Sequence, residues 1–277
     1  MTMLRLLVAA AIVFTPVVAG AQDEALPGRV MGAVRSALAP VLAAFPATDD
    51  SGAVPADGRS DAPWIVRAVQ PGERTIEILA NPLNEDHQRR AAKAMADIEA
   101  SILAAQRRAE AQYERAVAEA KRTGRSQDVD GISLSDEGVA GAKIDAESHV
   151  TIDVLFNQPS YRFEVASAIE PGPDAVLAAA LPGGAFLINI PANTYRDRQT
   201  KTERYCERET QIYLGQVAAP DVQKRPDSSI YEIGARSVAA PSSSAVSSLV
   251  LRIRGNPLVI DELLSKSNWA SLLELLR

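Results

Sequence analysis

Two carboxylates in the middle of the chain, Asp153 and Glu164, are the first candidates for acid–base chemistry. Residues 149–166 alternate apolar and polar side chains around a turn at 157–160, a pattern that predicts a β-hairpin. A four-residue turn places Asp153 opposite Glu164, with their Cβ atoms about 4.5–5.5 Å apart. Carboxylates that close split their pKa values and can serve as acid and base in glycoside or ester hydrolysis. The alternative is a solvated polar face on which Arg162 offsets the repulsion.

A second candidate site is the acidic segment 126–137, which resembles an EF-hand calcium-binding loop over this segment only. Acidic residues occupy its third, fifth and twelfth positions and a glycine its sixth, as in that loop. Serines stand at the first and eighth positions, where the loop usually has an aspartate and an apolar residue. The alternative is an acidic turn whose aspartates cap their own backbone, and no other cofactor is indicated. The resemblance implies calcium ligands at Ser126, Asp128, Asp130 and Glu137.

The single cysteine, Cys206, is the third candidate, as a nucleophile paired with His149 or His87. Arg204 and Arg208 flank it, and nearby cations lower the pKa of a thiol. The alternative is a solitary packed or surface thiol, because no nucleophile turn surrounds the cysteine. One cysteine forms no intramolecular disulfide, and two histidines with one cysteine do not predict a zinc site.

The first residues of the chain have the features of a secretory signal peptide. Arg5 precedes an apolar stretch over 6–18, and small residues lead to a cleavage point near Ala21, so that the leader covers 1–21. The apolar stretch is shorter than the roughly 20 residues that span a bilayer, and no later segment approaches that length. We therefore expect a periplasmic or secreted protein whose mature chain has no transmembrane anchor.

The composition is that of a folded protein. Hydrophobic residues make up 47% of the chain and charged residues 23%, both near the averages for globular proteins. The formal net charge is −6, and the cations are interspersed with acids, whereas nucleic-acid binding needs clustered Lys and Arg. The sequence therefore predicts a globular protein that does not bind nucleic acid.

Hydrophobic periodicity predicts an α+β fold with a mostly antiparallel sheet. Residues 22–63 contain one helix followed by a linker rich in Pro, Gly and Asp. Residues 64–277 form the α+β domain, because they combine short alternating segments with helical ones and end in two short helices. The segments expected as strands are the hairpins 64–79 and 149–166, together with 185–190, 209–217 and 247–254.

The strongest single element is a long helix over 85–122. Asn84 is a good N-cap, and Gly124 is placed to end the helix. At 1.5 Å per residue it is about 57 Å long. Its apolar stripe consists mostly of alanine, so that partners can approach closely. The residues of the stripe are Ala91, Ala94, Ile98, Ile102, Ala105, Ala109, Tyr113, Ala116 and Ala120. Such a helix can brace the sheet or extend beyond it as an oligomer arm. We favour the brace, because large residues do not sustain a coiled-coil heptad pattern.

These observations predict an exported, soluble, non-catalytic protein that acts by binding. Its partner is either another envelope protein or a second copy of itself, met through the long helix. The alternative is a periplasmic or secreted hydrolase that uses Asp153 and Glu164. The binding function is preferred because the motifs of common hydrolases and transferases are absent from the sequence.

Overall fold

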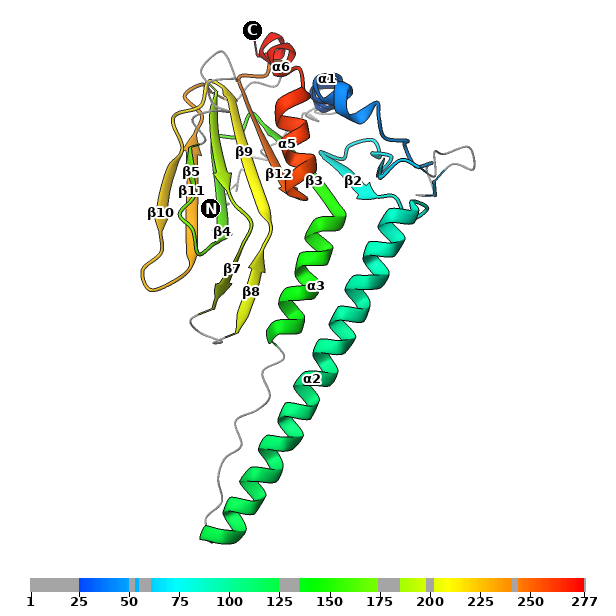
Figure 1. The fold of residues 1–277 in the computed structure, drawn as a ribbon. Helices are drawn as coiled ribbons and strands as arrows, with labels where there is room; N and C mark the ends of the chain where they lie inside the picture. Colours follow the sequence, from blue (N-terminus) through cyan, green and yellow to red (C-terminus); the bar gives the residue numbers. More distant parts are fainter. Residues whose placement is uncertain are drawn as a thin grey trace, which may run out of the picture.

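A seven-stranded sheet, antiparallel at every described pairing, runs through the middle of the molecule (Figure 1). The computed structural model describes residues 25–49, 53–54, 61–124, 135–173, 185–197, 202–240 and 244–276. In spatial order the strands are β1 (Trp64–Val66), β2 (Thr75–Ala80), β3 (His149–Phe156), β12 (Ser248–Gly255), β9 (Arg208–Gly215), β6 (Phe186–Ile190) and β5 (Gly172–Pro173).

A smaller sheet and a two-stranded ribbon accompany the large sheet. The smaller sheet has three antiparallel strands in the order β10 (Asp221–Lys224), β11 (Ile230–Arg236) and β4 (Ser160–Ala166). The ribbon pairs β7 (Asn193–Arg196) with β8 (Glu203–Cys206). The described residues thus form an α+β fold with a mostly antiparallel sheet, as the sequence predicted.

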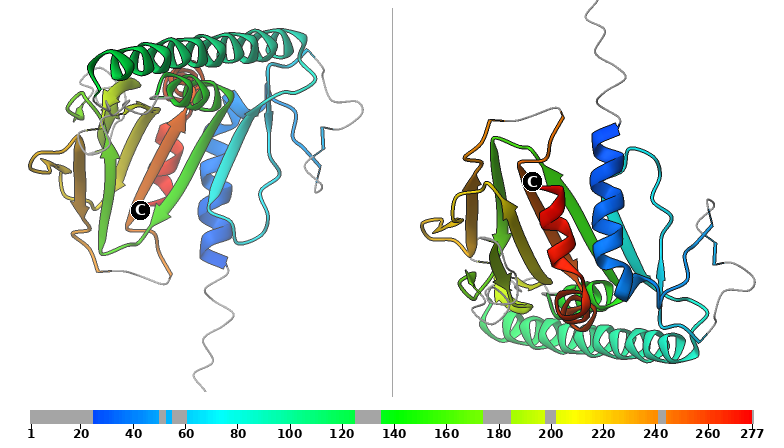
Figure 2. Two further views of the ribbon diagram at one scale, coloured as in Figure 1. Left: turned by 90° about the horizontal axis from the view of Figure 1, so that it is seen from below. Right: turned by 90° about the horizontal axis from the view of Figure 1, so that it is seen from above.

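Three helices cover one face of the large sheet: α1 (Ala25–Leu42), α5 (Pro257–Lys266) and α6 (Trp269–Leu275) (Figure 2). Alternate strand residues, such as Ile152 and Leu251, point into this core and are fully buried. Leu38 of α1 and Leu272 of α6 meet them from the helical side. The helix expected between residues 22 and 63 therefore packs on the sheet, and the carboxy-terminal helix buries its apolar face in the same core.

The opposite face of the large sheet is apolar at one end and ionic at the other. Val250 of β12 and Tyr213 of β9 are buried there against Phe163 of β4, in a second core between the two sheets. Further along β12 the residues on this face are Arg252 and Arg254, because side chains on a strand alternate between faces. β12 thus contributes side chains to both hydrophobic cores at one end and carries two arginines at the other.

The long helix α2 (Glu85–Thr123) begins and ends where its capping residues predict. The side chain of Asn84 accepts a hydrogen bond from the backbone N–H of His87 at 3.0 Å, and Gly124 ends the helix at φ +65°. A second helix, α3 (Ser135–Ser148), contacts α2 on one side and β8, β12 and β3 on the other. The long helix therefore reaches the sheets chiefly through α3, and its far end extends past α3 (Figure 1).

One expected strand pairing is wrong, although both of its strands exist. β3 pairs with β2 and β12 in the large sheet, and β4 pairs with β11 in the small sheet. Residues 149–166 therefore do not form a hairpin. In contrast, the hairpin predicted at 64–79 is confirmed, with Trp64 opposite Ala80.

Candidate functional site

A cavity of about 220 Å³ lies where β4 and the β7–β8 ribbon meet the ionic end of the large sheet. Its wall carries the aromatic side chains Tyr195 and Tyr205 and the thiol-bearing Cys206. The charged residues on the wall are Glu164, Glu207, Glu209, Arg252 and Arg254. Two of the residues singled out in the sequence, Glu164 and Cys206, therefore line one cavity.

Glu209 is the most deeply buried charged residue at the cavity, and both of its carboxylate oxygens accept hydrogen bonds. The guanidinium of Arg252 donates from Nε to Oε1 at 2.7 Å and from Nη2 to Oε2 at 2.8 Å. The amide of Gln211 donates a further hydrogen bond at 2.5 Å, and Gln211 in turn accepts one from Tyr213 at 2.6 Å. A bidentate pair of this kind holds both planes in a fixed orientation, so this part of the wall is rigid.

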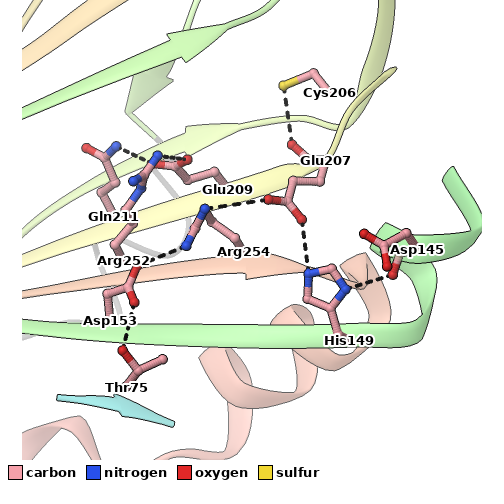
Figure 3. Close-up of polar contacts among 10 residues, drawn as sticks. All are labelled: Thr75, Asp145, His149, Asp153, Cys206, Glu207, Glu209, Gln211, Arg252 and Arg254. Atoms are coloured by element: carbon pink, nitrogen blue, oxygen red, sulfur yellow. Dashed lines mark hydrogen bonds and ion pairs between the residues drawn. The ribbon is translucent and has the colours of Figure 1, made fainter. Parts of the chain in front are cut away.

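A second polar chain crosses the sheet beside the first (Figure 3). Asp153 accepts hydrogen bonds from the hydroxyl of Thr75 and from Nη2 of Arg254, both at 3.1 Å. The other terminal nitrogen of Arg254 lies 3.9 Å from Glu207, and Nε2 of His149 lies 3.5 Å from the same carboxylate. One guanidinium thus serves two carboxylates, and Glu207 is the more distant of the two.

His149 gives Glu207 a charged partner only when the imidazole is protonated. Its Nδ1 lies 2.7 Å from the backbone carbonyl oxygen of Asp145, an atom that can only accept, so Nδ1 carries a proton. A neutral imidazole with its proton on Nδ1 has none on Nε2, the atom that faces Glu207. Burial raises the pKa of the Glu207 carboxyl, an effect that Arg254 and His149 offset only in part.

The environment of Cys206 makes the thiol a poor nucleophile, contrary to the effect expected from the flanking arginines. Burial, together with Glu209 and Glu207, raises the pKa of Cys206 to about 11. The thiol donates to the backbone carbonyl of Glu207 at 3.4 Å. His87 lies in the first turn of α2, and burial lowers its pKa. Among the described residues, the sulfur forms no hydrogen bond with either histidine.

Asp153 and Glu164 are not brought together. Asp153 lies opposite Arg252 on the large sheet, whereas Glu164 lies opposite Glu232 on the small one. Arg225 forms ion pairs with both Glu164 and Glu232. The expected acid–base pair is therefore wrong, and with it the geometric basis of the hydrolase alternative.

The calcium candidates fall where the structure gives no description. Ser126, Asp128 and Asp130 lie outside the described residues, and the side chain of Glu137 is not described either. Elsewhere, in the part of the chain that the structure does describe, no group of three or more His, Cys, Asp and Glu side chains could hold a metal ion. The leader predicted at 1–21 also lies outside the described residues.

Sequence reasoning missed most of the charged residues on the cavity wall. Glu207, Glu209, Arg252 and Arg254 occur as two pairs, each with a spacing of two residues. That spacing puts both members of a pair on the same face of a strand. The signal was therefore present as two charged pairs next to apolar strand segments, but the strand pairing that brings the two pairs together is a long-range feature.

Among the described helices, none combines the length and the apolar character needed to cross a membrane. Searches of this chain against protein-family models, curated proteins and solved structures each found no match.

Proposed function

We propose that the protein acts by binding, and that a second copy of the chain binds to the exposed face of α2. The observation that carries this proposal is the exposure of three large apolar side chains on that helix. Met95 is 55% exposed, Leu103 52% and Tyr113 62%. They are three of the seven large apolar side chains that are exposed in the described part of the chain. Apolar surface gathered on one element favours association.

The spacing of these side chains fits an antiparallel helix pair. Met95 and Tyr113 are separated by five turns at 3.6 residues per turn, so they lie on the same line along the helix. Their midpoint is Ala104, which is also the midpoint of α2 and lies next to Leu103. A twofold axis at this point brings Met95 against Tyr113 of the second copy and places the two Leu103 side chains near the axis.

Charges on this face give the pair a direction and limit its strength. Glu85 and Lys121 lie ten helical turns apart on the same side of α2, so the antiparallel arrangement sets the acid near the base at both ends. Glu99 and Glu110 face each other in the same arrangement and repel. We therefore expect a weak, concentration-dependent dimer that strengthens when one of these two carboxylates is neutralised.

Light scattering over a series of protein concentrations tests the proposal. Wild type should approach twice the monomer mass as the concentration rises, and Leu103→Glu should remain monomeric. Glu99→Gln should shift the transition to lower concentration. The matched control is Leu258→Glu on α5, which changes an exposed leucine (77%) outside α2 and should leave the dimer intact.

A wild type that stays monomeric at every concentration would rule out self-association through α2. Dissociation of the dimer by Leu258→Glu as readily as by Leu103→Glu would place the interface elsewhere on the molecule.

We also propose that the chain is exported, on the strength of the leader features at 1–21. Intact-mass measurement of the protein recovered from its native host should show a chain that begins after Ala21. A mass that includes Met1 would contradict export through cleavage of this leader.

A further inference from the structure

We propose that the cavity beside Glu207 is a binding site for a small organic cation, whose ammonium group binds the Glu207 carboxylate. This site is separate from the α2 face and does not rest on the self-association proposed above.

The charges around the cavity leave an excess of negative charge. Arg252 is fully used by Glu209, whose two oxygens both accept from it. Two other arginines near the cavity are each shared by two acids. Arg254 serves Asp153 and Glu207, and Arg225 serves Glu164 and Glu232. Among the residues that line the cavity, the three carboxylates Glu164, Glu207 and Glu209 stand against the two guanidinium groups of Arg252 and Arg254, so the wall has one more acid than base.

Of the three carboxylates on the cavity wall, Glu207 has the longest distances to its partners. Its two ion-pair distances, 3.5 Å to His149 and 3.9 Å to Arg254, are both beyond hydrogen-bond length. Nε2 of His149 carries a proton toward Glu207 only when the imidazole is charged. The Glu207 side chain remains 28% exposed and lines the cavity, so a ligand can reach it.

The rest of the wall fits the body of an organic ammonium ion. Two aromatic residues, Tyr195 and Tyr205, line the cavity from opposite faces of the β7–β8 ribbon, and the lining also includes the apolar residues Val165 and Ile190. A cation near an aromatic face is attracted by the ring in addition to its ion pair. A volume of about 220 Å³ holds roughly seven waters at ~30 Å³ each, which is the size of a short alkylamine.

Other ligand classes fit this wall less well. Anions meet three carboxylates, Glu164, Glu207 and Glu209, with both arginines of the wall already paired. A divalent metal ion needs several acidic or imidazole ligands at one point, and none of the described residues form such a group. A monovalent ammonium ion needs only one carboxylate and a hydrophobic wall.

Titration of the full chain with n-butylammonium chloride, followed by two-dimensional amide NMR, tests the proposal. The amide resonances of Tyr205, Glu207 and Arg254 should shift in a saturable manner, and tetramethylammonium should shift the same resonances. Sodium butyrate and calcium chloride serve as ligand controls and should leave the chemical shifts of these amides unchanged.

Two variants separate a binding role from a structural one. Glu207→Gln keeps the shape of the side chain and should weaken butylammonium binding at least about tenfold, because it removes the charge from the hydrogen bond. Tyr205→Leu keeps the carboxylate and should weaken binding several-fold. Glu262→Gln, which removes a surface acid that pairs with Lys266, is the matched control and should bind as wild type does.

Three outcomes would overturn the proposal: no saturable shift with butylammonium, an equal response to butyrate, or unchanged affinity in Glu207→Gln. Circular dichroism of each variant confirms that it is folded, and the Tyr205→Leu result tests the site independently of the carboxylate.

Discussion

Arg252 and Glu209 form a bidentate ion pair between two adjacent central strands, at the point where the apolar core gives way to the cavity. Glu209 is only 5% exposed, and the guanidinium of Arg252 lies 5.2 Å from the centre of the Phe163 ring. The pair is therefore both packed and hydrogen-bonded. Two opposite charges buried together stabilise each other, but removal of one leaves the other buried without a partner and destabilises the fold.

Removal of Arg252 should destabilise the fold more than removal of the Glu209 charge. Arg252→Met leaves a buried carboxylate without its cation and should lower the free energy of unfolding by about 3–5 kcal/mol. Glu209→Gln leaves an arginine whose side chain is 22% exposed and can reach water, so it should cost less. Urea unfolding of both variants and of the double variant measures these differences.

The double variant should be more stable than Arg252→Met alone, because it no longer buries an unpaired charge. Independent, additive losses in the two single variants would show that the pair is not coupled.

Gly255 occupies a position that no larger residue should tolerate. It adopts φ +120°, and a Cβ atom there would lie 2.1 Å from the carbonyl oxygen of His149. Gly255→Ala should therefore cost more than the roughly 1–2 kcal/mol of a left-handed residue alone. Gly72→Ala is the matched control, because Gly72 also has positive φ (+88°) but open space around it.

Thermal unfolding monitored by circular dichroism compares the two glycine variants. A larger loss of stability in Gly72→Ala than in Gly255→Ala would contradict the close approach of β12 to His149.

The buried carboxyl of Glu207 should make stability depend on pH. The pKa of this carboxyl is raised in the folded state. Its contribution to the free energy of unfolding is therefore fully present below the unfolded pKa of about 4.3. That contribution is lost as the pH rises through the folded pKa. Glu207→Gln removes this dependence. The variant should therefore gain stability relative to wild type as the pH rises from about 4.3 through the raised pKa of the folded state.

Paired urea unfolding curves of wild type and Glu207→Gln over that range measure the effect, with Glu262→Gln as a surface control. A stability difference that stays constant across the range would mean that Glu207 has an ordinary environment.

The long helix was predictable because its signals are local. Asn84 and Gly124 mark its ends, and its side chains repeat with the period of a helix over the whole length between them. Ala105 of the predicted apolar stripe is buried as expected, but Tyr113 is exposed. Periodicity therefore fixed the direction of the stripe but did not show how far along the helix α3 covers it.

The pairing of β3 with β4 failed because alternation encodes the face of a strand, not its neighbour. Asn157 follows β3 at φ +51°, and its side-chain oxygen accepts hydrogen bonds from the N–H and hydroxyl of Ser247. Tyr161 then bonds the hydroxyl of Ser248 at 2.8 Å. These contacts tie the turn to the start of β12, and the chain crosses to the other sheet. They join residues about 90 positions apart, beyond the reach of local patterns.

The same limit applies to the cavity. Alternation can show that Glu207 and Glu209 share a face, and that Arg252 and Arg254 share one. Only the register of β9 against β12, with Gln211 opposite Arg252, shows that the two faces coincide.

Cys206 should react slowly with alkylating reagents in the folded protein. Its pKa is about 11 against an ordinary value of 9.0, so near neutral pH the reactive thiolate is about 100-fold less abundant than in an ordinary thiol. The physical cause is burial beside Glu209 and Glu207, and unfolding removes it. The rate of iodoacetamide labelling, followed by intact mass, should therefore rise at least about 100-fold when the chain is unfolded in urea. Labelling of the folded protein at nearly the unfolded rate would show that Cys206 is exposed to water and lies away from both carboxylates.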